Sequence, residues 1–133
     1  MRRWNSTNYS KYGAKKTQLD GITFDSKKET QRYAELKMLE RCGAIRDLRL
    51  QPTYLLQENF KKNGKTYRKI EYKADFEYFD IQKGKVIVED VKGVKTEVYK
   101  IKKKLFEYKY PELSITEVWW IEQHYCLMKF TAI

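Results

Sequence analysis

Residues 67–79 alternate between apolar and charged or polar side chains, and this alternation constrains the fold more than any other feature of the sequence. The apolar positions are Ile70, Tyr72, Ala74, Phe76 and Tyr78. A period of two predicts one long strand with one buried face. A turn at 82–85 and an apolar run at 86–91 follow. We therefore expect a second strand that folds back on the first and lies centrally in the sheet.

Two other segments have the apolar spacing and the end signals of helices. Ser26 and Glu29 fit the capping pattern S-x-x-E, and the helix that they begin is expected to run to about Arg41. A second helix is expected over 96–110, because Pro111 stands just beyond it. The apolar residues of this second helix that we expect to face the core are Val98, Ile101, Leu105 and Tyr108.

Shorter segments complete the pattern of elements. Residues 53–57 are expected to form a strand, and Asn63-Gly64 predicts a hairpin turn after it. One or two final strands are expected at 114–121 and 125–133, which are rich in β-branched and aromatic residues. Since helices and strands are mixed along the chain, we predict an α/β or α+β fold with a mixed central β-sheet flanked by helices.

Length and charge indicate the domain organisation and the class of partner. The 133 residues suffice for one domain, which we expect at 18–133, after a flexible basic arm at 1–17. The formal net charge of +10 favours a polyanion, although it could serve solubility alone. The 11 Tyr, 6 Phe and 3 Trp can fill a core or stack on bases, so nucleic acid is the expected partner.

Other classes of protein are excluded by what the sequence lacks. Cys42 and Cys126 have no zinc-ligand spacing, so a zinc module is not expected. No apolar run is long enough to cross a membrane, and the basic start lacks the apolar stretch of a signal peptide, so neither is expected. We expect a protein of the reducing cytoplasm without membrane contact.

Three acids and a lysine form the candidate site. Asp90 and Lys92 are two residues apart on one strand and share a face, whereas Glu89 points to the other face. Asp75 lies 90 − 75 = 15 residues earlier, across a tight turn, so the two aspartates can meet if the strands pair. Converging carboxylates suit a hard cation such as Mg²⁺ or Mn²⁺. Lys92 would then stand near an attacking water or the charge that develops on phosphorus.

Each of these residues also has a structural interpretation. Glu29 could be the capping residue of its helix and nothing more, and the two aspartates could be exposed strand residues. Gln51 could lie beside the site, or it could satisfy backbone groups before Pro52. The three lysines that we predict to contact phosphates are Lys95, Lys100 and Lys103. A lysine run of this kind is otherwise a solvated face.

The motifs around these residues resemble the PD-(D/E)XK restriction-endonuclease-like superfamily. They are Asp75 after Ala74, the segment Asp90-Val91-Lys92, and the upstream helical Glu29. The strings at 12–16, 21–26, 50–52, 74–76 and 88–96 resemble, more narrowly, a small family of phage-encoded proteins assigned to that superfamily. A helical glutamate followed by Gln-Pro also resembles Holliday-junction resolvases and the endonuclease subunit of certain transposases.

This resemblance implies a restriction-endonuclease-like core and a specific set of roles. Glu29, Asp75, Asp90 and the Val91 carbonyl would hold the metal, and Lys92 would be the catalytic lysine. Ala74 replaces the proline of the motif, and Asp90 replaces the more usual glutamate, which shortens the reach to the metal.

The implied activity is that of a DNA endonuclease that uses Mg²⁺, with Mn²⁺ as an alternative. The substrate is expected to be branched DNA such as a Holliday junction, in phage recombination or replication within the bacterial cytoplasm. Cutting a junction needs two active sites, hence a homodimer. Two alternatives stay open: a nucleic-acid-binding module without catalysis, and a nuclease subunit of a larger recombination complex.

Overall fold

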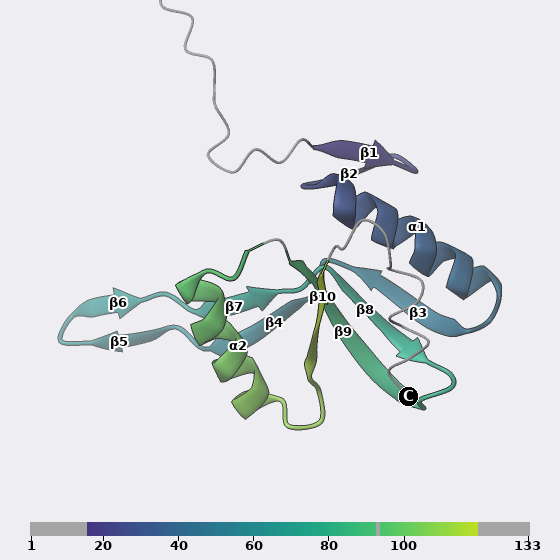
Figure 1. The fold of residues 1–133 in the computed structure, drawn as a ribbon. Coiled ribbons are helices and arrows are strands. Elements are labelled where there is room, and N and C mark those ends of the chain that lie inside the picture. Colours follow the sequence, from purple (N-terminus) through teal and green to yellow (C-terminus); the bar gives the residue numbers. More distant parts are fainter. Residues whose placement is uncertain (1–15, 93, 120–133) are drawn as a thin grey trace, which may run out of the picture.

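A four-stranded mixed sheet forms the centre of the molecule (Figure 1). The structure is a computed structural model that describes residues 16–92 and 94–119. The strands, in their order across the sheet, are β10 (Ile115–Trp119), β9 (Lys85–Lys92), β8 (Phe76–Asp80) and β3 (Ile45–Leu50). β9 is antiparallel to β8 and parallel to β10. The predicted α+β fold with a mixed central sheet is confirmed, and β9 is an interior strand as expected.

The remaining strands form three antiparallel pairs. They are β1 (Thr17–Leu19) with β2 (Ile22–Phe24), β4 (Thr53–Gln57) with β7 (Ile70–Lys73), and β5 (Phe60–Lys62) with β6 (Lys65–Tyr67). The hairpin turn at Asn63-Gly64 is confirmed, and both residues have the positive φ that a tight hairpin requires, 51° and 73°. The sequence analysis did not predict β1, β2, β3, β5 or β6. The expected arm at 1–17 lies outside the described residues except for its last two, and Thr17 already pairs with Phe24.

The single long strand predicted over 67–79 is wrong, because the chain bends at Ala74-Asp75 between β7 and β8. The alternation of apolar residues continues through the bend, but the core that they enter changes. Tyr72 and Ala74 pack with Val88 in one core, whereas Phe76 and Tyr78 pack with the residues of the other. The bend therefore lets one alternating segment supply the cores on both faces of the central sheet.

Both predicted helices are present, and each begins at a side-chain cap. α1 (Lys27–Arg41) follows Ser26, whose side chain accepts a hydrogen bond from the Glu29 N–H. α2 (Glu97–Lys109) follows Thr96, which caps the Tyr99 N–H in the same way. α1 lies against β1, β2 and β3, whereas α2 lies against β4 and β7 (Figure 1).

The predicted core face of α2 is wrong for three of its four residues. Val98, Ile101 and Tyr108 are 64%, 61% and 88% exposed, and only Leu105 packs against the core. The buried residues are instead Tyr99 and Phe106. They contact Tyr72 and Tyr54 of the β4–β7 pair, with ring centroids 6.3 Å apart for Tyr72–Tyr99 and 5.0 Å apart for Tyr54–Phe106. Aromatic rings bury more apolar area than Val or Ile, so they decide which face of the helix turns inward.

The C-terminal prediction can be compared with the structure only in part. β10 lies within the strand expected at 114–121, whereas residues 120–121 and the strand expected at 125–133 lie outside the described residues. Neither helix in the described ranges is long and apolar enough to cross a membrane.

Candidate active site

Three backbone hydrogen bonds hold Asp75 at the bend between β7 and β8. The Gln51 N–H donates to the Asp75 carbonyl (2.9 Å), the Ala74 N–H donates to the Pro52 carbonyl (3.0 Å), and the Asp75 N–H donates to the Glu89 carbonyl (3.1 Å). Gln51 has a φ of 50°, the left-handed conformation that turns the chain from β3 into β4. The Gln51 side chain is exposed and does not line the pocket described below, so the structure does not place it beside the site.

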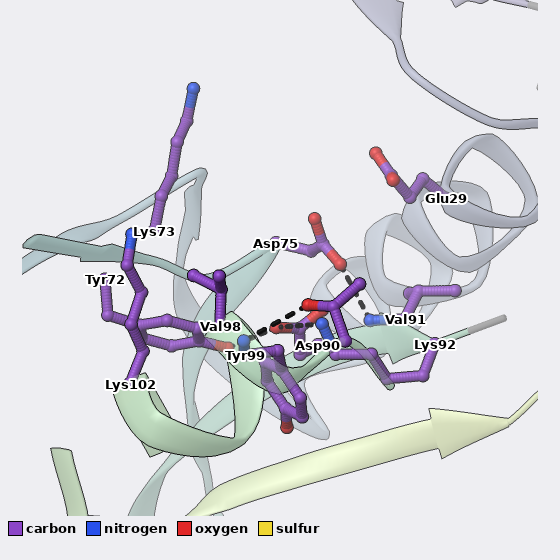
Figure 2. A pocket seen from close by; sticks show the side chains of 11 residues that line it. Glu29, Tyr72, Lys73, Asp75, Asp90, Val91, Lys92, Val98, Tyr99 and Lys102 are labelled. Carbon is purple, nitrogen blue, oxygen red and sulfur yellow. Dashed lines mark hydrogen bonds and ion pairs between the residues drawn. The ribbon is translucent and has the colours of Figure 1, made fainter. Parts of the chain in front are cut away.

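One pocket of about 390 Å³ opens beside this bend, between the first turns of the two helices. All four residues predicted to be catalytic line it, and so does Val91: Glu29, Asp75, Asp90, Val91 and Lys92. Figure 2 shows Asp75 and Asp90 in the middle of the group, with Glu29 on α1 at its edge. The fold therefore brings together residues that are as far apart in sequence as Glu29 and Lys92.

Specific contacts hold the carboxylates and the lysine in this pocket. The Val91 N–H donates to Asp75 Oδ2 (2.7 Å), and the Tyr72 hydroxyl donates to Asp90 Oδ2. The Lys92 ammonium lies 3.0 Å from the same Asp90 oxygen and 3.6 Å from the centroid of the Tyr99 ring (Figure 2). Asp90 is only 5% exposed, so these contacts largely define its surroundings.

The carboxylates in the pocket repel one another. Burial and, after it, the negative charges of Glu29 and Asp90 together raise the pKa of Asp75 to about 8. Burial also raises the pKa of Glu29, as do the charges of Asp25 and Asp90. The pKa of Tyr72 is raised by burial and by Asp90, so its hydroxyl remains the donor to that carboxylate. A group of mutually repelling carboxylates is the electrostatic environment that a divalent cation relieves.

Glu89 lies on the opposite face of β9 from Asp90, as the alternation predicts. Its carboxylate is fully buried, receives a hydrogen bond from Tyr78 (2.5 Å) and is paired with Arg32 of α1. Arg32 follows Glu29 by about one helical turn. The buried pair thus fixes the helix that carries Glu29 against the strand that carries Asp90.

Comparison with known proteins places the chain in a family. Residues 9–127 match the family described as "Protein of unknown function (DUF1064)". The chain belongs to this family. No curated protein and no solved structure matches the chain. The DUF1064 match covers the whole pocket, but its description attaches no chemistry to it.

The lysines that line the pocket of this DUF1064 protein differ from those predicted to contact phosphates. Lys95 and Lys103 each lie 2.8 Å from Glu117, and Lys100 lies 2.9 Å from Glu97. Burial opposes the charge of Glu117, yet hydrogen bonds from Lys103, Lys95 and Tyr99 lower its pKa to about 2. These three lysines surround a separate hollow of about 330 Å³ that contains Glu117.

Lys73 and Lys102 line the acidic pocket instead, and the sequence analysis did not single them out. Lys73 could have been found from the strand alternation. It precedes Asp75 by two residues, so the alternation places both on the face opposite to that of Tyr72. Lys102 could be found only after Tyr99 and Phe106 are known to face inward, because all three then share one side of α2.

The donor atoms of the cluster fit a hard divalent cation. Carboxylate and carbonyl oxygens are the ligands that Mg²⁺ and Mn²⁺ prefer. The pKa of Asp75 is raised by burial and then by the charges of Glu29 and Asp90, and such a cation would neutralise these charges. In residues 16–92 and 94–119, no three acidic, histidine or cysteine side chains form a group that could hold a metal ion as they stand. The three carboxylates share one pocket without being arranged as a metal site.

Proposed function

We propose that the protein is a metal-dependent endonuclease that hydrolyses phosphodiester bonds in DNA. The observation that carries the proposal is the meeting of Asp75, Asp90 and Lys92 in one pocket, with Glu29 facing it from α1. Acids from two neighbouring strands and one helix, with a lysine two residues after the second acid, supply both metal ligands and a cation for phosphate chemistry.

Each residue has a distinct role in this proposal. Glu29, Asp75 and Asp90 would hold Mg²⁺ or Mn²⁺, together with the Val91 carbonyl. When bound, such an ion polarises a phosphoryl oxygen and lowers the pKa of a bound water. Lys92 stabilises the negative charge that develops on phosphorus. Tyr72 and the Val91 N–H are positioning groups, because they fix the two aspartates through hydrogen bonds.

DNA is the proposed substrate because of the charge around the pocket. Lys73 and Lys102 line it together with the acids, and the whole chain carries a net charge of +10. We propose a branched structure such as a Holliday junction, as the resemblance of the motifs to Holliday-junction resolvases implies. A homodimer would supply the two active sites. The setting would be phage recombination or replication in the host cytoplasm.

A cleavage panel tests the proposal. Supercoiled, linear, flapped and four-way DNA are incubated with the full-length protein and Mg²⁺, Mn²⁺ or EDTA. We expect cleavage that needs the divalent ion, is strongest on the four-way DNA and is lost in Asp90→Asn. Cleavage that persists undiminished in Asp90→Asn would refute the assignment of the site.

A binding module without catalysis is the second candidate, and one contact favours it. The Lys92 ammonium already lies 3.0 Å from Asp90 Oδ2, so the protein itself compensates part of the acidic charge. Titration calorimetry distinguishes the two functions. If DNA binds with a strong salt dependence while neither Mg²⁺ nor Mn²⁺ produces a binding isotherm, the binding module is the better description.

A nuclease subunit that needs a partner is the third candidate. The exposed apolar residues Val94, Val98, Ile101 and Tyr108 on and before α2 are a surface that another protein could cover. This candidate predicts that the purified chain binds divalent metal but cuts none of the DNA forms until a partner is added. Analytical ultracentrifugation of the purified chain shows whether a second copy is that partner.

A further inference from the structure

The β5–β6 hairpin extends away from the central sheet (Figure 1). Every residue from 57 to 69 is exposed, including the strand residues and the turn. The hairpin is nevertheless regular, with a tight Asn63-Gly64 turn and a complete antiparallel register. A two-stranded hairpin in water is marginally stable on its own, so one this exposed needs a local source of stability.

One face of the hairpin combines an aromatic pair with two lysines. The register pairs Phe60 with Tyr67 and Lys62 with Lys65, which places all four side chains on the same face. The two rings stack with centroids 4.7 Å apart and planes 7° apart, and this stack stabilises the hairpin. Phe60 and Tyr67 are still 43% and 39% exposed, so the pair also offers a flat apolar surface to a ligand.

Within the described part of the chain, the two lysines have no acidic partners that would balance them. Like charges directly opposite each other on a hairpin are destabilising. Among the described residues, no carboxylate forms an ion pair with Lys61, Lys62 or Lys65, whereas nearby Lys69 is paired with Glu71 at 2.7 Å. Lys65 lies over the Tyr67 ring, 5.2 Å from its centroid. The excess positive charge at the tip matches an external polyanion.

We propose that the β5–β6 hairpin is a DNA-binding arm, with Lys62 and Lys65 as its phosphate contacts. A two-stranded ribbon has the width to enter the major groove of duplex DNA, and phosphate contacts position a protein without reading sequence. The arm rests on DNA as the substrate of the proposed function, but it adds a binding surface outside the acidic pocket.

The length of the arm limits how far apart on the DNA the hairpin tip and the acidic pocket can lie. Gly64 at the tip precedes Asp75 by 75 − 64 = 11 residues. An extended chain of that length spans at most about 36 Å, which is about one turn of B-form DNA. The arm therefore contacts phosphates within about ten base pairs of the bond that lies at the acidic pocket.

Equilibrium DNA binding in EDTA tests the arm without any cleavage. Fluorescence anisotropy measures the affinity of the full-length protein for labelled duplexes of about 8 and about 24 base pairs, at several salt concentrations. The test variant is Lys62→Gln/Lys65→Gln. The matched control is Lys83→Gln/Lys85→Gln, which removes the same charge from the exposed turn and strand start between β8 and β9. Thermal unfolding verifies that both variants fold.

The salt slope is the steepness with which the logarithm of the binding constant falls with the logarithm of the salt concentration. On the longer duplex, the loss of two phosphate contacts should lower this slope by about 1.8, at about 0.9 per contact. Between 50 and 200 mM salt, the wild-type protein should then lose about 12-fold more affinity than the test variant. The control variant should retain the wild-type slope, and the short duplex should show little difference between the three proteins.

The outcomes separate this proposal from the proposed function. Equal slopes for the wild-type protein and the Lys62→Gln/Lys65→Gln variant would overturn the arm while leaving the nuclease proposal intact. Equal losses in the test and control variants would also overturn it, because the effect would then be one of net charge. If the wild-type protein binds no DNA, both proposals fail.

Discussion

Arg32 of α1 and Glu89 of β9 form a buried, two-pronged ion pair. The Arg32 Nε donates to Glu89 Oε2 at 2.7 Å, and Nη2 donates to Oε1 at 2.5 Å. The two residues are 2% and 0% exposed. This pair joins the helix that carries Glu29 to the strand that carries Asp90, so it connects the stability of the fold with the geometry of the pocket.

The first prediction concerns the free energy of unfolding when this pair is broken. Arg32→Leu leaves the buried Glu89 carboxylate without its guanidinium, and we expect a loss of about 3–5 kcal/mol in urea unfolding. The double variant Arg32→Leu/Glu89→Leu removes both charges and should regain at least half of that loss. A double variant as unstable as Arg32→Leu would show that the stability comes from packing and not from the pair.

The second prediction concerns catalysis by the acidic pocket. Asp75→Asn, Asp90→Asn and Lys92→Gln should each lower the rate of Mg²⁺-dependent cleavage by about a hundredfold or more, because each removes a metal ligand or a charge at phosphorus. Glu71→Gln is the matched control, since Glu71 lies on β7 outside the pocket and pairs with Lys69. DNA binding in EDTA should persist in all four variants. A similar loss in the control would disconnect the pocket from the activity.

The third prediction concerns pH and Asp75. Its pKa is raised in the folded protein from 3.8 to about 8, so the native state keeps a proton that the unfolded chain releases. The stability contributed by this group is complete below about pH 4 and falls as the pH rises towards 8. We expect Asp75→Asn to be more stable than the wild-type protein at pH 9 in EDTA, and the two proteins to converge near pH 4. Thermal unfolding across this range measures the difference.

Divalent metal should make the wild-type protein more stable than Asp75→Asn at pH 9. A proton and a metal ion compete for the same carboxylate, so Mg²⁺ should raise the melting temperature of the wild-type protein more at pH 9 than at pH 6. Asp75→Asn should gain little at either pH. If Mg²⁺ stabilises the two proteins equally, Asp75 is not a ligand.

The fourth prediction separates the two roles open to Glu29. Its N–H is capped by the Ser26 hydroxyl (3.2 Å), while its carboxylate faces the pocket. Ser26→Ala should cost about 1 kcal/mol of stability and leave metal affinity unchanged. Glu29→Gln keeps the cap, so it should change stability by less than about 0.5 kcal/mol and weaken Mg²⁺ binding in calorimetry. The reverse pattern would make Glu29 a capping residue only.

Much of the candidate site could be predicted from sequence because local rules govern it. Strand alternation selected Asp90 over Glu89, and the structure places these two residues on opposite faces of β9. The cap at Ser26 correctly marked the start of α1. By contrast, the inward face of α2 could not be predicted. Val98 with Ile101 and Tyr99 with Phe106 both have helical spacing, so the pattern alone does not decide which pair is buried. The choice depended on the aromatic residues of β4 and β7.

The sequence by itself determined where the helices begin, which face of β9 carries Asp90, and the turn at Asn63-Gly64. These features rest on hydrogen bonds and side-chain directions within a few residues. Only the tertiary structure decided the bend at Asp75, the position of the Gln51 side chain away from the pocket and the lysines that line the acidic pocket. Those depend on pairing between strands distant in sequence, such as the bond from Gln51 to Asp75, and no local pattern specifies which strands will meet.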